Sequence, residues 1–184
     1  LRKKRIILGV TGSIAAYKAG EVISALKKGG IDVTVIMTRQ AGHFITPLTL
    51  QTLSGNKVYE DMFSPVADWG PGHISLAETA DLILICPATA SIIGKLSNGL
   101  CDDLLSCVVM ASRARVLICP AMNENMYLNP IVSKNIKFLK KTGYKFIDPV
   151  YGRLACGSTG IGHLALLETI IQAVKEELKK VNNG

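Results

Sequence analysis

Five short apolar runs, separated by longer segments, constrain the fold of this chain more than any other feature of its sequence. They cover residues 6–10, 33–37, 82–86, 116–119 and, with more polar residues, 144–147. Within each run most positions are hydrophobic, whereas a strand with one face in water alternates apolar and polar residues. The runs therefore predict the strands of a sheet that is covered on both faces.

The segments between these runs carry apolar residues at helical spacing. They cover residues 15–28, 47–53, 91–97 continuing into 103–112, 129–141 and 166–181. Strands that alternate with helices indicate right-handed crossovers and a parallel sheet. We therefore expect an α/β fold, a doubly wound parallel sheet of the Rossmann-like type, in a single domain that spans residues 1–184.

Composition and charge disfavour several classes of protein. Hydrophobic residues make up 48% of the chain and charged residues 19%, as in a folded globular domain. No apolar run approaches the ~20 residues that cross a bilayer, and no signal peptide is evident, so we expect no membrane and a cytoplasmic location. The formal charge of +7 comes from basic clusters without interleaved aromatic residues, which disfavours nucleic acid as a partner. A mean hydropathy of +0.31 favours burial of apolar surface between subunits.

The cysteines and histidines are spaced too irregularly for a metal site, so we expect no metal. Four cysteines lie in apolar segments and are expected to be packing residues: Cys86, Cys101, Cys107 and Cys119. Cys156 lies instead among four glycines in 152–162, as either a functional thiol on a flap or a chance surface cysteine. His73 lies in a predicted loop ahead of a buried strand, as either a general base or an exposed loop histidine.

Ligands of doubly wound sheets bind beyond the carboxyl ends of the strands. That rule selects the loops at 11–14, 38–46, 87–91 and 120–129, each more polar or richer in glycine and proline than the strand before it. The last of them, PAMNENMYLN, places bulky and polar side chains where we expect them to face a ligand.

The first loop indicates which ligand fits. Gly9-Val-Thr-Gly12-Ser13 brings small residues to the start of a helix, which suits a phosphate but also an ordinary turn and N-cap. The loop is not GxGxxG, and the second run ends in Met37-Thr38-Arg39 without a ribose-binding carboxylate, so a dinucleotide is disfavoured. Residues 94–97 also lack the pattern of a P-loop. A mononucleotide with one phosphate and a broad ring fits better.

Seven motifs, in this order, resemble the family of flavin-containing cysteine decarboxylases over nearly the whole chain. They are VTGSIAA at 10–16, HISL at 73–76, ADL at 80–82, PATA at 87–90, GLCDDLL at 99–105, PAMNENM at 120–126 and LACG at 154–157. The resemblance implies the flavoprotein type of the fold, with FMN as cofactor. The matching binding positions are Gly12, Ser13, Ile14, Thr38, Phe44, Thr89, Ala90, Ser91 and, close to the flavin, Met122.

The resemblance also implies the chemistry. The family removes CO2 from a cysteine attached through an amide, without net redox change, after the thiol side has been oxidised to a thioaldehyde. His73 matches the active-site base, Asn123 the residue that hydrogen-bonds the substrate carboxylate, and Cys156 the proton donor of the final reduction. The implied substrate is phosphopantothenoylcysteine, which yields phosphopantetheine in coenzyme A biosynthesis.

Other readings stay open beside this one. Relatives of the family decarboxylate the C-terminal cysteine of a peptide, transfer prenyl groups to flavin, or act as non-catalytic subunits of larger complexes. The presence of His73, Asn123 and Cys156 favours the enzyme. Members of the family assemble as homo-oligomers, either trimers or dodecamers.

The chain departs from the family pattern at a few positions. Tyr127 replaces a common Trp, and Ser91-Ile92 replaces Asn-Thr. Ser158 and His163 stand where bacterial relatives usually have Asp and Arg, so closure over the substrate could differ.

Overall fold

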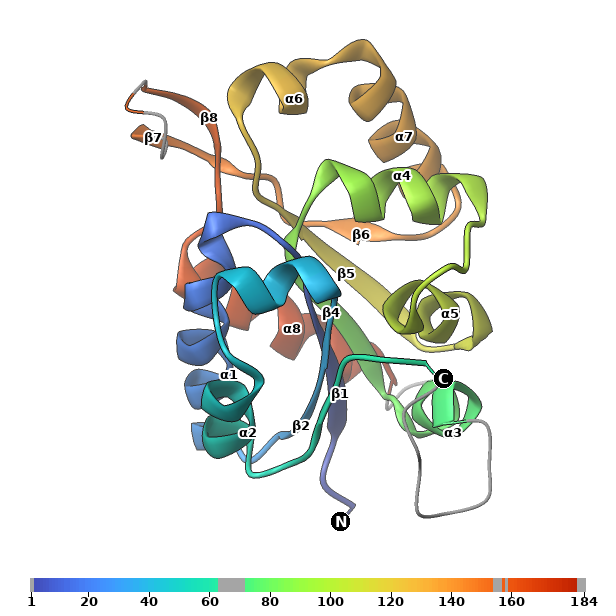
Figure 1. Ribbon diagram of the computed structural model, residues 1–184. Helices are drawn as coiled ribbons and strands as arrows, with labels where there is room; N and C mark the ends of the chain where they lie inside the picture. Colours follow the sequence, from blue (N-terminus) through green and yellow to red (C-terminus); the bar gives the residue numbers. More distant parts are fainter. Residues whose placement is uncertain (1, 63–71, 154–156, 158, 182–184) are drawn as a thin grey trace.

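A parallel sheet of six strands forms the centre of the computed structural model, which describes residues 2–62, 72–153, 157 and 159–181 (Figure 1). In spatial order the strands are β3 (Val58–Tyr59), β2 (Asp32–Met37), β1 (Arg5–Val10), β4 (Leu82–Ala88), β5 (Arg115–Pro120) and β6 (Lys145–Phe146). The order 3-2-1-4-5-6 is that of a doubly wound Rossmann-like fold. The predicted fold class is confirmed, and the strand order reverses between β1 and β4.

Two layers of helices cover the sheet (Figure 1). The helices α1 (Ala19–Lys28), α2 (Pro47–Ser54) and α8 (Leu167–Val181) pack on one core cluster. The helices α3 (Gly72–Thr79), α4 (Ala90–Asn98), α5 (Leu104–Ala111) and α7 (Pro130–Lys141) pack on the other. Ile6, Leu8 and Val10 of β1 point to the first cluster and Ile7 to the second. Both faces of the strand are apolar for this reason.

The helix predicted to run from 91–97 into 103–112 is in fact two helices. α4 ends at Gly99, whose φ of 68° is in the left-handed region that glycine adopts most readily. α5 then begins after Asp103, whose carboxylate accepts a hydrogen bond from the Ser106 amide at 2.8 Å in a capping box. The predicted helix at 129–141 likewise has a separate short helix before it, α6 (Glu124–Leu128).

Three further features were not predicted. The segment around His73 is wrongly predicted as a loop, because α3 begins at Gly72 and buries Leu76 and Ala77 against the second core. The chain after β1 first forms a 3-10 turn, η1 (Ile14–Lys18), and a second, η2 (Arg39–His43), follows β2. Near the C-terminus, β7 (Val150–Arg153) and β8 (Thr159–His163) pair as an antiparallel hairpin.

The cysteines differ partly from expectation. Cys86 and Cys119 are fully buried in the first core, as predicted for packing residues. Cys101 is exposed in the connection between α4 and α5, so its prediction as a packing residue is wrong. Cys107 is half-buried, and its thiol lies 3.2 Å from the Cys101 carbonyl oxygen. Among the described helices, none is both long and apolar enough to span a bilayer.

Candidate functional site

A cavity of about 570 Å³ opens at the carboxyl edge of the sheet, where the strand order reverses. Its volume is in the range of small-molecule and cofactor sites. The described residues that line it come from three loops and the hairpin: Gly12, Ser13, Ile14, Ala15, Tyr17, Lys18, Thr89, Ala90, Ala121, Met122, Asn123, Met126, Gly162, His163 and Leu164.

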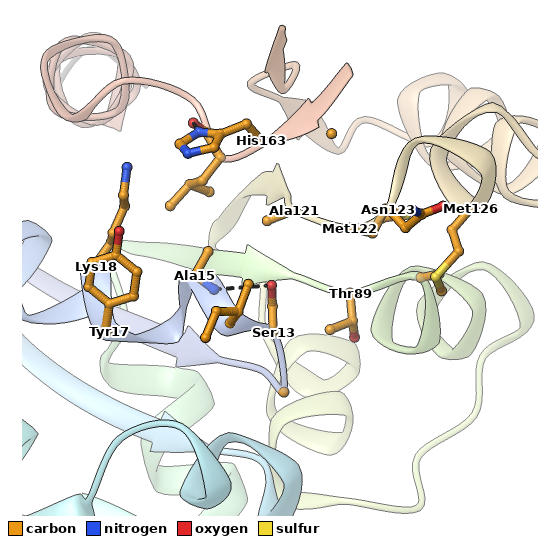
Figure 2. Close-up of a pocket in the computed structure, with 15 residues that line it drawn as sticks. Ser13, Ala15, Tyr17, Lys18, Thr89, Ala121, Met122, Asn123, Met126 and His163 are labelled. Carbon is orange, nitrogen blue, oxygen red and sulfur yellow. Dashed lines mark hydrogen bonds between the residues drawn. The ribbon is translucent and has the colours of Figure 1, made fainter. Parts of the chain in front are cut away.

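Thr11 joins the first and third loops beneath the cavity. Its buried hydroxyl donates to the carbonyl oxygen of Pro87 at 2.8 Å and accepts from the Thr89 amide at 3.0 Å. Ser13 then accepts a hydrogen bond from the Ala15 amide at 3.3 Å and caps η1 (Figure 2). These bonds fix the relative position of the loops that follow β1 and β4.

Asn123 begins the short helix α6. Its side-chain oxygen accepts from the Asn125 amide at 2.9 Å, so the side chain is held at the mouth of the cavity. Figure 2 shows Met122, Asn123 and Met126 along one wall, with Ser13 on the other side. The loop after β5 therefore presents an amide and two thioethers to the same space.

The hairpin closes another wall because it is bonded to this loop. The Met122 amide donates to the Gly162 carbonyl oxygen at 3.1 Å, and the Ile161 amide donates to Glu124 Oε1 at 3.0 Å. A Cβ at position 160 would lie 2.5 Å from the Glu124 carboxyl carbon, and one at position 162 would collide with the Met122 carbonyl. Glycine at both positions lets β8 approach this closely.

Thr38 has a buried hydroxyl oxygen with no hydrogen-bond partner in the described part of the chain. Its amide donates to the Val10 carbonyl oxygen at 3.0 Å, so Thr38 lies beside the end of β1 and the start of the first loop. Gly12 packs directly against the second loop, because a Cβ on residue 12 would be only 2.5 Å from the Gln40 Cβ. An unpaired buried hydroxyl is costly, which makes this a position where a ligand oxygen would be favourable.

A family model described as Flavoprotein matches residues 1–179. The chain belongs to the flavoprotein family. This flavoprotein is 47% identical over 177 residues to a probable phosphopantothenoylcysteine decarboxylase of Streptococcus mutans, with 95% of the chain and 99% of that relative covered. It is 45% identical over 176 residues to the coenzyme A biosynthesis bifunctional protein CoaBC of Bacillus subtilis, with 96% of the chain covered. It spans only 43% of that relative's length.

The fold of the flavoprotein is also similar to solved structures. A Cys-to-Ser mutant of PPC decarboxylase, complexed with pantothenoylaminoethenethiol, superposes with a TM-score of 0.86 at 30% sequence identity. The match covers 97% of this chain and 100% of the other. The arrangement of sheet and helices is therefore shared over 97% of this chain.

The predicted cofactor positions of the flavoprotein fall into two groups. The cavity brings together Gly12, Ser13, Ile14, Thr89, Ala90 and Met122, with the predicted substrate residue Asn123 beside them. Thr38, Phe44 and Ser91 are not among its described lining residues. Phe44 is 44% exposed, and Ser91 is exposed on α4.

Neither of the two predicted catalytic residues is among the described residues that line the cavity. The backbone of His73 is the second residue of α3, a helix that leads toward the amino end of β4. Cys156 lies outside the described residues, and in sequence it falls after β7 and before β8. Both roles stay predictions.

The structure also adds residues that the sequence did not single out for the site. Tyr17 and Lys18 line the cavity from η1, and Leu164 lines it after the hairpin. His163, which the sequence marks as a departure from the family pattern, lines the cavity from the end of the hairpin. Met126 lines it too, whereas Tyr127 packs on the second core. Burial, with a further contribution from Asp148, raises the pKa of Tyr127, which keeps its hydroxyl protonated at neutral pH. No group of three metal-ligating side chains occurs in the described part of the molecule.

Proposed function

We propose that this flavoprotein binds FMN and decarboxylates 4'-phosphopantothenoylcysteine to 4'-phosphopantetheine, a step of coenzyme A biosynthesis. The observation that carries the proposal is the cavity in which the PAMN loop, with Met122 and Asn123, faces the loop of Gly12 and Ser13. The near full-length similarity to a probable phosphopantothenoylcysteine decarboxylase supports it.

The residues at the carboxyl edge fit FMN. The Thr38 hydroxyl has no partner in the described structure, so it could donate a hydrogen bond to a phosphate oxygen beside the end of β1. Gly12 has no side chain, so a phosphate and its ester chain can approach the backbone there. The walls formed by Ala121, Met122 and Leu164 are apolar and suit a broad ring. Bound FMN would supply the transient oxidation at the thiol side of the substrate and its reversal.

Asn123 would orient the substrate carboxylate. A neutral amide donates a hydrogen bond without bringing a positive charge, and a cation would stabilise the carboxylate more than the transition state that loses CO2. The hydrogen bond from the Asn125 amide to the Asn123 side-chain oxygen, at 2.9 Å, fixes the orientation of this amide group at the cavity. His73 as base and Cys156 as proton donor complete the proposed set.

A homo-oligomer in the cytoplasm is part of the proposal. Large apolar side chains are exposed, among them Ile14 at 56% and Tyr17 at 54%, which line the cavity, and Leu48 of α2 at 70%. Exposed large apolar side chains are typical of a surface that another subunit covers. A second copy could then bring Phe44 or His73 to a cavity that a single chain does not present to them.

Turnover by the purified protein tests the proposed function. Protein loaded with FMN is incubated with phosphopantothenoylcysteine, and products are followed by mass spectrometry. We expect loss of CO2 and accumulation of phosphopantetheine. A protein that retains FMN and leaves the compound unchanged would contradict the proposal.

A peptide with a C-terminal cysteine separates the main alternative. The peptide also carries an amide-linked cysteine, so the same decarboxylation could act on it. The two substrates differ only in the groups that the protein must recognise. We expect the small molecule to be processed with the higher kcat/KM. A preference for the peptide would assign the protein to the peptide-modifying branch instead.

A further inference from the structure

The ammonium group of Lys18 and the imidazole of His163 lie at one end of the cavity. Figure 2 shows them with Tyr17 on the left, whereas Asn123 and Met126 lie on the right. Among the described residues that line the cavity, Lys18 is the only one with a formal charge at neutral pH, and none is a carboxylate. One end of the cavity therefore carries a positive charge, whereas the end with Asn123 and Met126 is neutral.

Lys18 lacks an ion-pair partner within the described residues, whereas other half-buried lysines of this protein have one. Lys95, for example, pairs with Asp102 at 2.7 Å and with Asp103 at 2.6 Å. Lys18 is itself half-buried at the junction of η1 and α1 and lines the cavity. An ammonium group in this setting gains most from an anionic ligand.

His163 is oriented by its own backbone. Its Nδ1 lies 3.0 Å from the carbonyl oxygen of Leu164. A carbonyl only accepts, so Nδ1 carries the hydrogen and Nε2 is the nitrogen left for a ligand. In the imidazolium form, Nε2–H would donate a hydrogen bond to an anionic oxygen.

We infer that Lys18 and His163 form the binding site for the phosphate monoester of the substrate, at the end of the cavity remote from Asn123. The inference rests on the proposed function and deepens it by assigning substrate specificity. The two anionic ends of phosphopantothenoylcysteine then meet different groups. The carboxylate that must leave as CO2 meets a neutral amide, and the phosphate that stays meets the Lys18 ammonium group and the His163 imidazole.

This division has a kinetic consequence. A phosphate far from the reacting carbon is bound equally in the ground state and the transition state, so its contacts lower KM without changing kcat. It also separates this substrate from a peptide with a C-terminal cysteine, which has no phosphate at that distance. Lys18 and His163 are therefore specificity residues and not catalytic ones.

The test compares substrates with and without the phosphate. For Lys18→Gln we expect the ratio of kcat/KM for phosphopantothenoylcysteine over pantothenoylcysteine to fall about ten-fold, mainly through KM, as for the loss of one charge-assisted hydrogen bond. His163→Gln should lower the ratio less, and Lys18→Arg should restore most of it. Lys28→Gln, an exposed lysine at the far end of α1, is the matched control and should leave the ratio unchanged. An unchanged ratio in Lys18→Gln would overturn the inference.

The phosphate of FMN is the competing occupant, and flavin fluorescence distinguishes it. The Kd of FMN should stay within two-fold of wild type in Lys18→Gln, as a rough bound. A ten-fold weaker FMN affinity with an unchanged substrate ratio would place the cofactor phosphate there and overturn the assignment.

Calorimetry separates failure of the inference from failure of the proposed function. Phosphopantetheine and pantetheine are titrated into the FMN-loaded protein, which needs no turnover. Tighter binding of phosphopantetheine, lost in Lys18→Gln, supports the phosphate site even if no CO2 is released. Equal binding of the two compounds by wild type contradicts the site even if decarboxylation proceeds.

Discussion

Thr38 is a single residue whose unpaired buried hydroxyl indicates a ligand-binding position. Its hydroxyl is buried without a partner in the described structure, beside the loop of Gly12. Thr38→Val should weaken FMN binding about five-fold, or ~1 kcal/mol, because a ligand oxygen loses its donor. Thr38→Ser, the matched control, should bind FMN nearly as wild type does.

The stability of the FMN-free protein gives an independent check of Thr38. Valine removes a buried unpaired hydroxyl, so urea unfolding without FMN should show equal or higher stability for Thr38→Val. A large loss of stability, with FMN affinity unchanged, would show that Thr38 is a structural residue.

Asn123 has two functions that substitutions can separate. It caps α6 through its side-chain oxygen and presents an amide to the cavity. Asn123→Ser retains a capping oxygen but cannot reach as far, so we expect kcat to fall about a hundred-fold while the fold stays intact. Asn125 lies two residues further along the chain, is exposed and does not line the cavity, so Asn125→Ala should have near wild-type kcat. Equal activities of the two variants would remove Asn123 from the mechanism.

At the scale of elements, Glu124 connects the hairpin to α6. Its carboxylate accepts from the Ile161 amide, and Gly160 leaves room for it. We expect Glu124→Ala to lower the free energy of unfolding by ~1.5 kcal/mol, as for loss of a hydrogen bond to a charged group. Glu124→Gln retains an acceptor oxygen and should cost less.

A double-mutant cycle tests whether Glu124 and Gly160 act as a pair. Gly160→Ala alone forces its Cβ against the Glu124 carboxylate, so it should destabilise the protein. In a Glu124→Ala background the same change should cost less by at least ~0.5 kcal/mol. Additive effects in urea unfolding would contradict a direct contact.

The junction of α4 and α5 gives a pH-dependent prediction. Burial alone would raise the pKa of Asp103, but hydrogen bonds from Lys95 and Ser106 outweigh it and hold the pKa below the usual carboxyl range. A depressed pKa means that this stabilisation is present above the unfolded-state pKa and is lost as the pH falls through the folded one. Asp103→Asn should therefore reduce stability near neutral pH and flatten its decline below about pH 4, measured by thermal melts. Parallel pH profiles for the two proteins would contradict it.

The helices and strands were predictable where nearly every residue of a strand is apolar. β1 and β4 lie between two cores, so both of their faces are apolar and the runs stand out in the sequence. The hairpin was not predicted, because glycines at 160 and 162 replace the alternating side chains by which a strand is recognised. α3 was missed because it has only eight residues, begins at the last glycine of a Gly-Pro-Gly sequence and has little apolar periodicity.

The site was predictable in part, for a related reason. The loops after β1, β4 and β5 follow buried strands, so topology alone brings Ser13, Thr89 and Asn123 to one edge. Lys18 and His163 are 145 positions apart in sequence, and only the folded hairpin brings the second to the cavity of the first. Phe44 and Ser91 do not line it within one chain.

For the molecule as a whole, the proposed homo-oligomer would explain why these residues do not line the cavity, if subunits share their sites. If His73 of one copy serves the cavity of another, two inactive variants can complement each other. A mixture of His73→Asn and Asn123→Ser, refolded or co-expressed, should be clearly more active than either variant, because some sites then combine two wild-type residues. Activity no greater than that of the parents would indicate that each chain supplies its own set.

The position of bound FMN tests the central claim most directly, namely that the carboxyl edge of the sheet is the cofactor site. A crystal structure of the FMN-loaded protein should show the ring in the cavity that Ser13, Thr89 and Met122 line. FMN bound anywhere else, such as the shallow groove between α1 and α2 that Glu21 and Leu53 line, would contradict the account.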